Sequence, residues 1–134
     1  MASLTNDLHK LGYVHRNMKG SNVLWMEREA RWALVDFACM ARIGEAASLS
    51  FTLTYAPPEA ARALQQERTA IASCTSHDAW SVGVIGYELI TGRAALDVAS
   101  EGIDRVRALH LLYMRKMPPV SVLSFHVLVL YMQQ

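Results

Sequence analysis

The segment from Asp78 to Gly92 restricts the fold more than any other part of the chain. Asp78 is a residue type that caps the start of a helix, and Gly92 is one that ends it. The residues between them are apolar on nearly every side of such a helix, which is typical of a helix at the centre of a domain. The segment is also shorter than the roughly 20 residues that a membrane-spanning helix needs. The sequence therefore predicts a fold built around one buried helix.

The size and composition of the chain indicate a single globular domain. Its 134 residues suffice for one core and are too few for two ordinary domains. A hydrophobic fraction of 52% with a charged fraction of 19% argues against intrinsic disorder. The net charge is +1 and the basic residues are scattered, so we expect neither nucleic acid nor an anionic membrane surface as a partner.

The cysteines and the ends of the chain bear on the compartment. Cys39 and Cys74 are too few for a disulfide framework, and residues 1–7 lack the features of a signal peptide. The apolar stretch Val120–Met132 is interrupted by polar residues and is too short to span a membrane. We expect an intracellular, cytoplasmic protein without a membrane anchor.

Shorter patterns predict the remaining elements. Leucines at helical spacing end at Gly12, which predicts a short first helix. Residues 22–25 and 32–35 flank a charged turn and predict a small β-hairpin. Residues 38–54 predict one long surface loop, and a helix-compatible segment follows at 59–66. Beyond the central helix, residues 103–114 have the pattern of an amphipathic helix that ends before two prolines, and the tail fits either helix or strand.

Two short motifs border the predicted hairpin. The first runs from His15 to Asn22 and reads H-R-N-M-K-G-S-N. The second, Asp36-Phe37-Ala38, begins fourteen residues after Asn22. Each alone is weak, because motifs of three residues occur by chance in many proteins.

Two further motifs follow in the second half of the chain. Thr52, Tyr55 and Pro58-Glu59 form a T-x-x-Y-x-x-P-E pattern. Asp78 opens the sequence D-A-W-S-V-G at the start of the central helix. Four motifs in a fixed order are a far more specific signal than any one of them.

Together the motifs resemble those of eukaryotic-type protein kinases of the Ser/Thr kind, with H-R-N in place of H-R-D and D-F-A in place of D-F-G. The resemblance implies the helical C-terminal lobe of a kinase, mainly α with a small β-hairpin. No Gly-rich phosphate loop is found, so we expect the N-terminal lobe to be absent. Residues 1–96 form the kinase-like region, and residues 97–134 are a divergent tail.

Asn17 and Lys19 occupy the catalytic positions that the resemblance implies. In kinases the residue at the position of Asn17 is an aspartate that accepts or orients the proton of the substrate hydroxyl. An amide lacks that basicity, and general-base action is typically worth ~10²–10⁴ in rate. The alternative interpretation, which we favour, is that Asn17 is an amide that caps its own loop. Lys19 would neutralise the transferred phosphate, or it is an ordinary surface charge.

The resemblance also implies a nucleotide and a metal. Asn22 and Asp36 would be the oxygen ligands of Mg²⁺ bound with ATP, since hard oxygen ligands suit this ion. Alternatively, Asp36 caps the loop that follows it.

Several other residues have structural or regulatory roles by resemblance. His15 and Phe37 would stack inside the lobe, which is also what ordinary core packing predicts. Arg16 would pair with a phosphorylated residue of the activation segment, for which Ser48, Ser50 and Thr52 are candidates, or it is a solvated surface charge. Glu59 would take an arginine partner that the tail does not supply, and Asp78 opens the central helix.

Three hypotheses about function remain open. The first is a pseudokinase-like module that binds another protein on the apolar face left by the missing lobe, near Val14, Leu24 and Phe37. The second is a Ser/Thr kinase using ATP, whose N-terminal lobe comes from a longer product or another chain. The third is a truncated gene without selected activity. Whether the chain is an enzyme stays open at this point.

Overall fold

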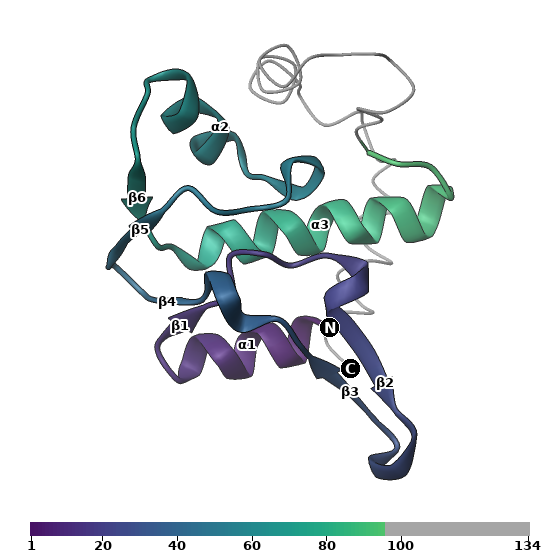
Figure 1. Ribbon diagram of the computed structural model, residues 1–134. Helices are drawn as coiled ribbons and strands as arrows, with labels where there is room; N and C mark the ends of the chain where they lie inside the picture. Colours follow the sequence, from purple (N-terminus) through teal and green to yellow (C-terminus); the bar gives the residue numbers. More distant parts are fainter. Residues whose placement is uncertain (96–134) are drawn as a thin grey trace.

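The computed structural model describes residues 1–95 and contains three α-helices. They are α1 (Ala2–Lys10), α2 (Pro58–Gln65) and α3 (Thr75–Thr91). Helix α3 runs through the middle of the molecule, with α1 on one side of it and α2 on the other (Figure 1). The predicted helix at 103–114, the proline break and the tail 97–134 lie outside the described residues.

Within residues 1–95, six short strands pair into three separate antiparallel sheets of two strands each: β1 with β4, β2 with β3, and β5 with β6. The strands are β1 (Tyr13–Val14), β2 (Val23–Met26), β3 (Arg31–Leu34), β4 (Ala41–Arg42), β5 (Ala46–Ser48) and β6 (Ala70–Ala72). The described residues thus contain three helices and small sheets rather than helices and one hairpin.

Helix α3 is the buried helix that the sequence predicts, but its start differs. The cap is Cys74, and Asp78 lies within the first turn, where it is fully buried. The prediction that Asp78 caps the helix is wrong, because the helix begins three residues before Asp78 and its carboxylate points at another segment. Gly92 ends the helix in the left-handed conformation, as predicted. The burial does not reach the end of the helix, since Leu89 is 79% exposed.

The first helix and the hairpin are confirmed. Helix α1 is followed by Gly12 with φ +86°. Strands β2 and β3 pair in a register that places Trp25 opposite Trp32. Their ring centroids are 5.3 Å apart in an edge-on arrangement, which is a favourable geometry for aromatic pairs.

The predicted loop at 38–54 is not without structure. It contains β4 and β5, and β4 pairs with β1 while β5 pairs with β6. Strands of two or three residues have no detectable alternation of apolar and polar positions, so neither β5 nor the unpredicted β6 gives a strand signal. The pairing holds the segment between the hairpin and α2 against the body of the molecule.

Helix α2 packs on this segment through small side chains. Ala60, Ala63 and Ile71 form a buried cluster against which Leu49 and Phe51 pack. Because the alanine side chains on one face of α2 are small, the helix backbone lies close to β6. None of the helices in the described range is long and apolar enough to cross a membrane.

Candidate functional site

The candidate site lies around the loop His15–Asn22, which connects β1 to β2 at the side of α3. The carboxylate of Asp78, inside α3, fixes the start of this loop. It accepts hydrogen bonds from the backbone N–H groups of His15 and Arg16, each at 2.8 Å. The Nε2 atom of His9 in α1 lies 2.9 Å from the same carboxylate. One buried acid therefore joins α1, the loop and α3.

The role of Asp78 differs from the sequence-based expectation, and His9 is a residue for which the sequence predicts no role. A carboxylate within the first turn of an otherwise apolar helix is the signal for Asp78, since buried acids need several donors. Nothing in the local sequence singles out His9. Its position relative to Asp78 depends on the packing of α1 against α3.

Asn17, Thr52 and Asp36 come together from three segments. The Oγ1 hydroxyl of Thr52 donates to Asn17 Oδ1 at 2.8 Å. The Nδ2 amide of Asn17 faces Asp36 Oδ2 at 3.4 Å. The side chain of Asn17 is thus not simply a cap for its own loop, because both ends of the amide contact other segments.

Asn22 is the fourth residue of the same cluster. It is almost entirely buried, and its Nδ2 amide donates to the backbone carbonyl of Asn17 at 2.9 Å. The same amide faces Asp36 Oδ2 at 3.4 Å. Asp36 itself has φ +62°, a conformation that is uncommon for a residue other than glycine and is typical of strained functional turns.

His15 and Phe37 lie side by side, with ring centroids 5.2 Å apart. His15 is fully buried and its Nε2 atom lies 3.1 Å from the carbonyl of Val35, whereas Phe37 is 44% exposed. The stack therefore has one ring in the core and one at the surface. Val14 has no exposed surface, so the expectation that it contributes to an apolar surface patch is wrong.

Arg16 and Lys19 have contrasting surroundings. The Arg16 guanidinium is buried and donates to backbone carbonyls of the segment that follows Asp36. Lys19 is partly exposed and forms no ion pair with any described residue. The structure places the Arg16 guanidinium against residues 39–48, and it leaves Lys19 partly exposed in the loop His15–Asn22.

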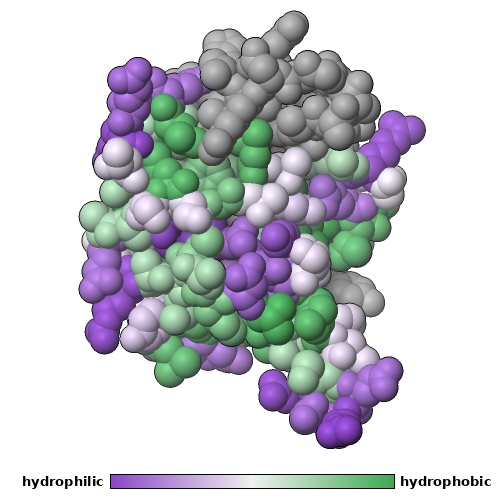
Figure 2. Space-filling model, viewed as in Figure 1, coloured by the Kyte–Doolittle hydropathy of each residue, from purple (hydrophilic) through white to green (hydrophobic). Residues whose placement is uncertain are grey.

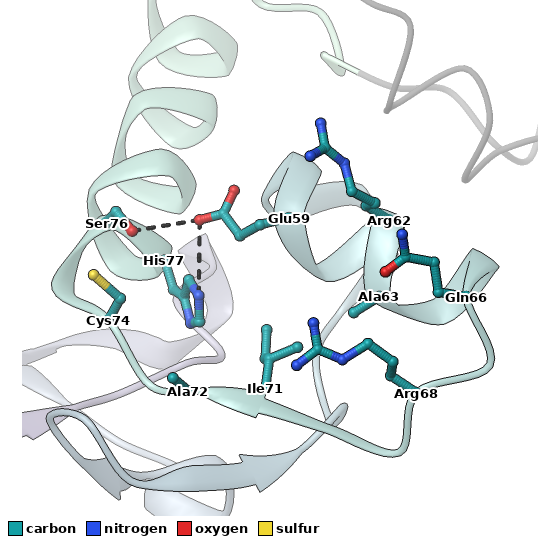
Figure 3. Close-up of a pocket in the computed structure, with 10 residues that line it drawn as sticks. All are labelled: Glu59, Arg62, Ala63, Gln66, Arg68, Ile71, Ala72, Cys74, Ser76 and His77. Carbon is teal, nitrogen blue, oxygen red and sulfur yellow. Dashed lines mark hydrogen bonds and ion pairs between the residues drawn. The ribbon is translucent and has the colours of Figure 1, made fainter.

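Glu59 lies in a different place, next to the start of α3. Its Oε1 atom accepts a hydrogen bond from Ser76 Oγ at 3.3 Å and is 3.7 Å from His77 Nε2 (Figure 3). Burial lowers the pKa of His77, and the charge of Glu59 partly offsets this effect. The two residues border a hollow of about 460 Å³ between α2, β6 and α3, with Arg68 at its opposite end.

Tyr55 connects the end of the segment that carries β4 and β5 to α3. Its hydroxyl donates to Glu88 Oε2 at 2.9 Å, and Ser81 Oγ donates to the Tyr55 carbonyl at 2.9 Å. Burial, followed by the hydrogen bond and charge of Glu88, raises the pKa of Tyr55 to about 12. Nothing in the local sequence connects Glu88 with Tyr55, because their contact depends on how the segment before α2 packs on α3.

The donor atoms near Asp36 fit Mg²⁺ only in part. Asp36 supplies a carboxylate and Asn22 an amide oxygen, and both are the kind of ligand that this ion prefers. No cluster of three His, Cys, Asp or Glu side chains suited to a metal exists in residues 1–95. Two protein ligands are enough where substrate phosphates complete an octahedral shell, so Asp36 and Asn22 would hold the ion only together with a nucleotide.

The chain is similar to protein kinases from several organisms. It is 33% identical over 92 residues to the Citron Rho-interacting kinase of Mus musculus, covering 66% of this chain and 4% of that protein. It is 34% identical over 95 residues to the serine/threonine-protein kinase SBK1 of Mus musculus, covering 69% of this chain and 22% of that protein. The chain thus spans only a small part of the length of these relatives.

The backbone agrees with this similarity. The Cydia pomonella granulovirus kinase PK-1 superposes with a TM-score of 0.70 at 27% identity, covering 95% of this chain and 46% of that one. A profile of the protein kinase domain matches residues 3–126, which is most of the sequence and extends past residue 96. The chain belongs to the protein kinase family.

Proposed function

We propose that this chain is the helical C-terminal lobe of a protein kinase domain, impaired in phosphoryl transfer, and that it works as a pseudokinase-like module that binds another protein. The observation that carries the proposal is the bonding of Asn17. An amide stands at the position of the catalytic base and is held on one side by Thr52 and on the other by Asp36.

The chemistry of an amide explains why this arrangement opposes catalysis. A carboxylate at position 17 would accept the proton of a substrate hydroxyl, which an amide does not do. The loss of general-base action alone lowers the rate by ~10²–10⁴. Asn17 also donates to Asp36, so the cluster is satisfied without a cation, whereas two neighbouring carboxylates would repel each other.

Two apolar hollows at the β2–β3 hairpin support the binding of a protein partner. One, of about 330 Å³, is bordered by Val23, Trp32, Ile85 and Leu89 among others. The other, of about 310 Å³, includes Leu11 and Phe37. Figure 2 shows apolar surface near the base of the hairpin, while its tip is hydrophilic.

The proposed occupant of these hollows is an apolar surface of a second protein. The chain covers 46% of the viral kinase that it superposes on, so that kinase contains further protein beyond the matching part. Exposed apolar patches on soluble proteins mark such interaction sites.

Thermal unfolding with Mg-ATP tests the catalytic part of the proposal. A ligand that binds only the folded state raises the melting temperature by an amount that grows with the logarithm of its excess over Kd. We expect no change for the natural chain in saturating Mg-ATP. A rise of several degrees that disappears in Asp36→Asn would overturn the proposal.

The variant Asn17→Asp tests the amide directly, without an activity assay. It places a second carboxylate beside Asp36, so we expect a lower melting temperature in EDTA and partial recovery in Mg²⁺. Asn17→Ser, which adds no charge, is the matched control and should not respond to Mg²⁺. An Asn17→Asp variant that is as stable as the natural chain in EDTA would contradict the role given to the amide.

A Ser/Thr kinase activity using ATP is the second candidate, favoured by the closeness of Asp36 and Asn22 at the site. Several relatives are named serine/threonine-protein kinases, including AtPK1/AtPK6 of Arabidopsis thaliana, which is 31% identical over 96 residues. This function needs an N-terminal lobe from a longer product or another chain. The Mg-ATP shift described above would favour it.

A further inference from the structure

Arg16 is a buried cation that forms no ion pair with an acidic side chain in residues 1–95. Arg16 is only 8% exposed, and its Nη atoms donate to the backbone carbonyls of Cys39, Ala47 and Ser48. Its Nε atom has no hydrogen-bond partner among the described residues. Buried charges are normally paired with an opposite charge, and none of the ion pairs of the described residues involves Arg16.

The electrostatics of Arg16 agree with this geometry. Burial lowers the pKa of its guanidinium, and the positions of Cys39 and Asp78 oppose that effect. The carboxylate of Asp78 already accepts two backbone N–H groups from residues 15 and 16. Of the two groups that oppose the effect of burial on Arg16, Cys39 is the one still able to gain a negative charge.

Cys39 contacts the guanidinium through its backbone carbonyl. Its carbonyl accepts a hydrogen bond from Arg16 Nη1 at 3.2 Å, and its Sγ atom is 3.2 Å from Ser50 Oγ. The thiol is free and partly exposed, so small oxidants can reach it. It sits at the end of the 3₁₀ turn Phe37–Cys39, between the site and the segment that carries β5.

We propose that Cys39 is an oxidation site whose anionic product pairs with Arg16. A peroxide supplies the oxidant. The sulfur attacks one peroxide oxygen, the O–O bond breaks, and Cys–SH plus H₂O₂ gives Cys–SOH plus H₂O. A second equivalent gives the sulfinate, Cys–SO₂⁻, with release of one proton and one more water.

The sulfinate would supply the missing counterion at this place. Its oxygens accept hydrogen bonds from a guanidinium, and charge-assisted bonds of this kind are stronger than those to neutral carbonyls. The pair would tie the loop His15–Asn22 to the turn after Asp36. Oxidation should therefore stabilise the segment between Asp36 and β5.

Cys74 provides an internal control. It is exposed, and hydrogen bonds from Ser76 lower the pKa of its thiol, so it also reacts with peroxide. Its charged neighbour is Glu59, which opposes a negative product. Oxidation of Cys74 should bring no gain in stability.

The test compares Cys74→Ser, which retains Cys39, with Cys39→Ser, which retains Cys74. Each is treated with hydrogen peroxide, and intact mass and melting temperature are measured. We expect two added oxygens in both, with a rise of several degrees only in Cys74→Ser. A Cys39 that stays unmodified while Cys74 reacts, or that gains two oxygens without a rise, overturns the proposal.

A pair of variants tests the charge without any oxidant. Cys39→Asp and Cys39→Asn have nearly the same shape and differ in one negative charge. In the Cys74→Ser background we expect Cys39→Asp to melt several degrees above Cys39→Asn at neutral pH, and this gap to close as the carboxylate is protonated. Equal melting temperatures at neutral pH would exclude an anion-accepting role for Arg16.

Discussion

One buried carboxylate fixes the position of the loop that carries the site residues. Asp78 accepts from the N–H groups of His15 and Arg16 and contacts His9, so it serves three donors with no exposed surface. Replacing it with Asn removes the charge and turns one of its acceptor atoms into a donor. A donor left facing a backbone N–H lowers the free energy of unfolding by about 1–3 kcal/mol, and by more where a charged group is lost.

We therefore expect Asp78→Asn to lower the free energy of unfolding by about 3 kcal/mol, measured by urea denaturation. The matched control is Asp7→Asn, which removes an exposed carboxylate 3.8 Å from Lys10. Surface pairs of this kind contribute about 0–1 kcal/mol. Equal losses in the two variants would show that the buried carboxylate is not what holds the loop.

The helices and strands that can be predicted from the sequence are those with long, regular patterns of apolar and polar residues. Helix α3 and the hairpin β2–β3 follow from apolar residues and a charged turn. Strands β5 and β6 do not, because each has three residues and exists only through its pairing with the other. The residues of the site follow the same rule. The loop His15–Asn22 is recognisable as a motif, whereas the contact of Asn17 with Thr52 depends on how a distant segment folds back.

The contact between Tyr55 and α3 gives a testable prediction. The folded-state pKa of Tyr55, about 12, lies above its ordinary value of 10.0. A raised pKa means that the folded state holds the proton more tightly. The stabilisation is complete below pH 10 and is lost as the pH rises from about 10 to about 12.

Tyr55→Phe removes the hydroxyl that donates to Glu88 Oε2. This variant should have a free energy of unfolding about 1 kcal/mol lower than the natural chain at neutral pH, as expected for the loss of one hydrogen bond. The natural chain should lose stability more steeply than Tyr55→Phe between pH 10 and pH 12, and the difference between the two urea-unfolding curves isolates Tyr55 from other groups. Parallel curves across this range would contradict the role of the Tyr55 hydroxyl.

At the scale of the whole molecule, the central helix is buried along most of its length but exposed at its end. Leu89 borders the apolar hollow that also contains Trp32 and Ile85, and 79% of its surface is exposed. An apolar side chain in that position contributes little to the stability of the isolated chain. Its burial would stabilise a complex by roughly 25 cal/mol per Å² of apolar surface removed from water.

We expect Leu89→Lys to leave the melting temperature nearly unchanged and to weaken the binding of an apolar fluorescent dye such as anilinonaphthalene sulfonate. Ile43→Lys is the matched control, because Ile43 is also exposed but borders neither hollow at the hairpin. If both variants reduce dye binding equally, apolar exposure is diffuse over the molecule. If only Leu89→Lys reduces it, the apolar surface is concentrated beside the end of α3, where a protein partner would bind.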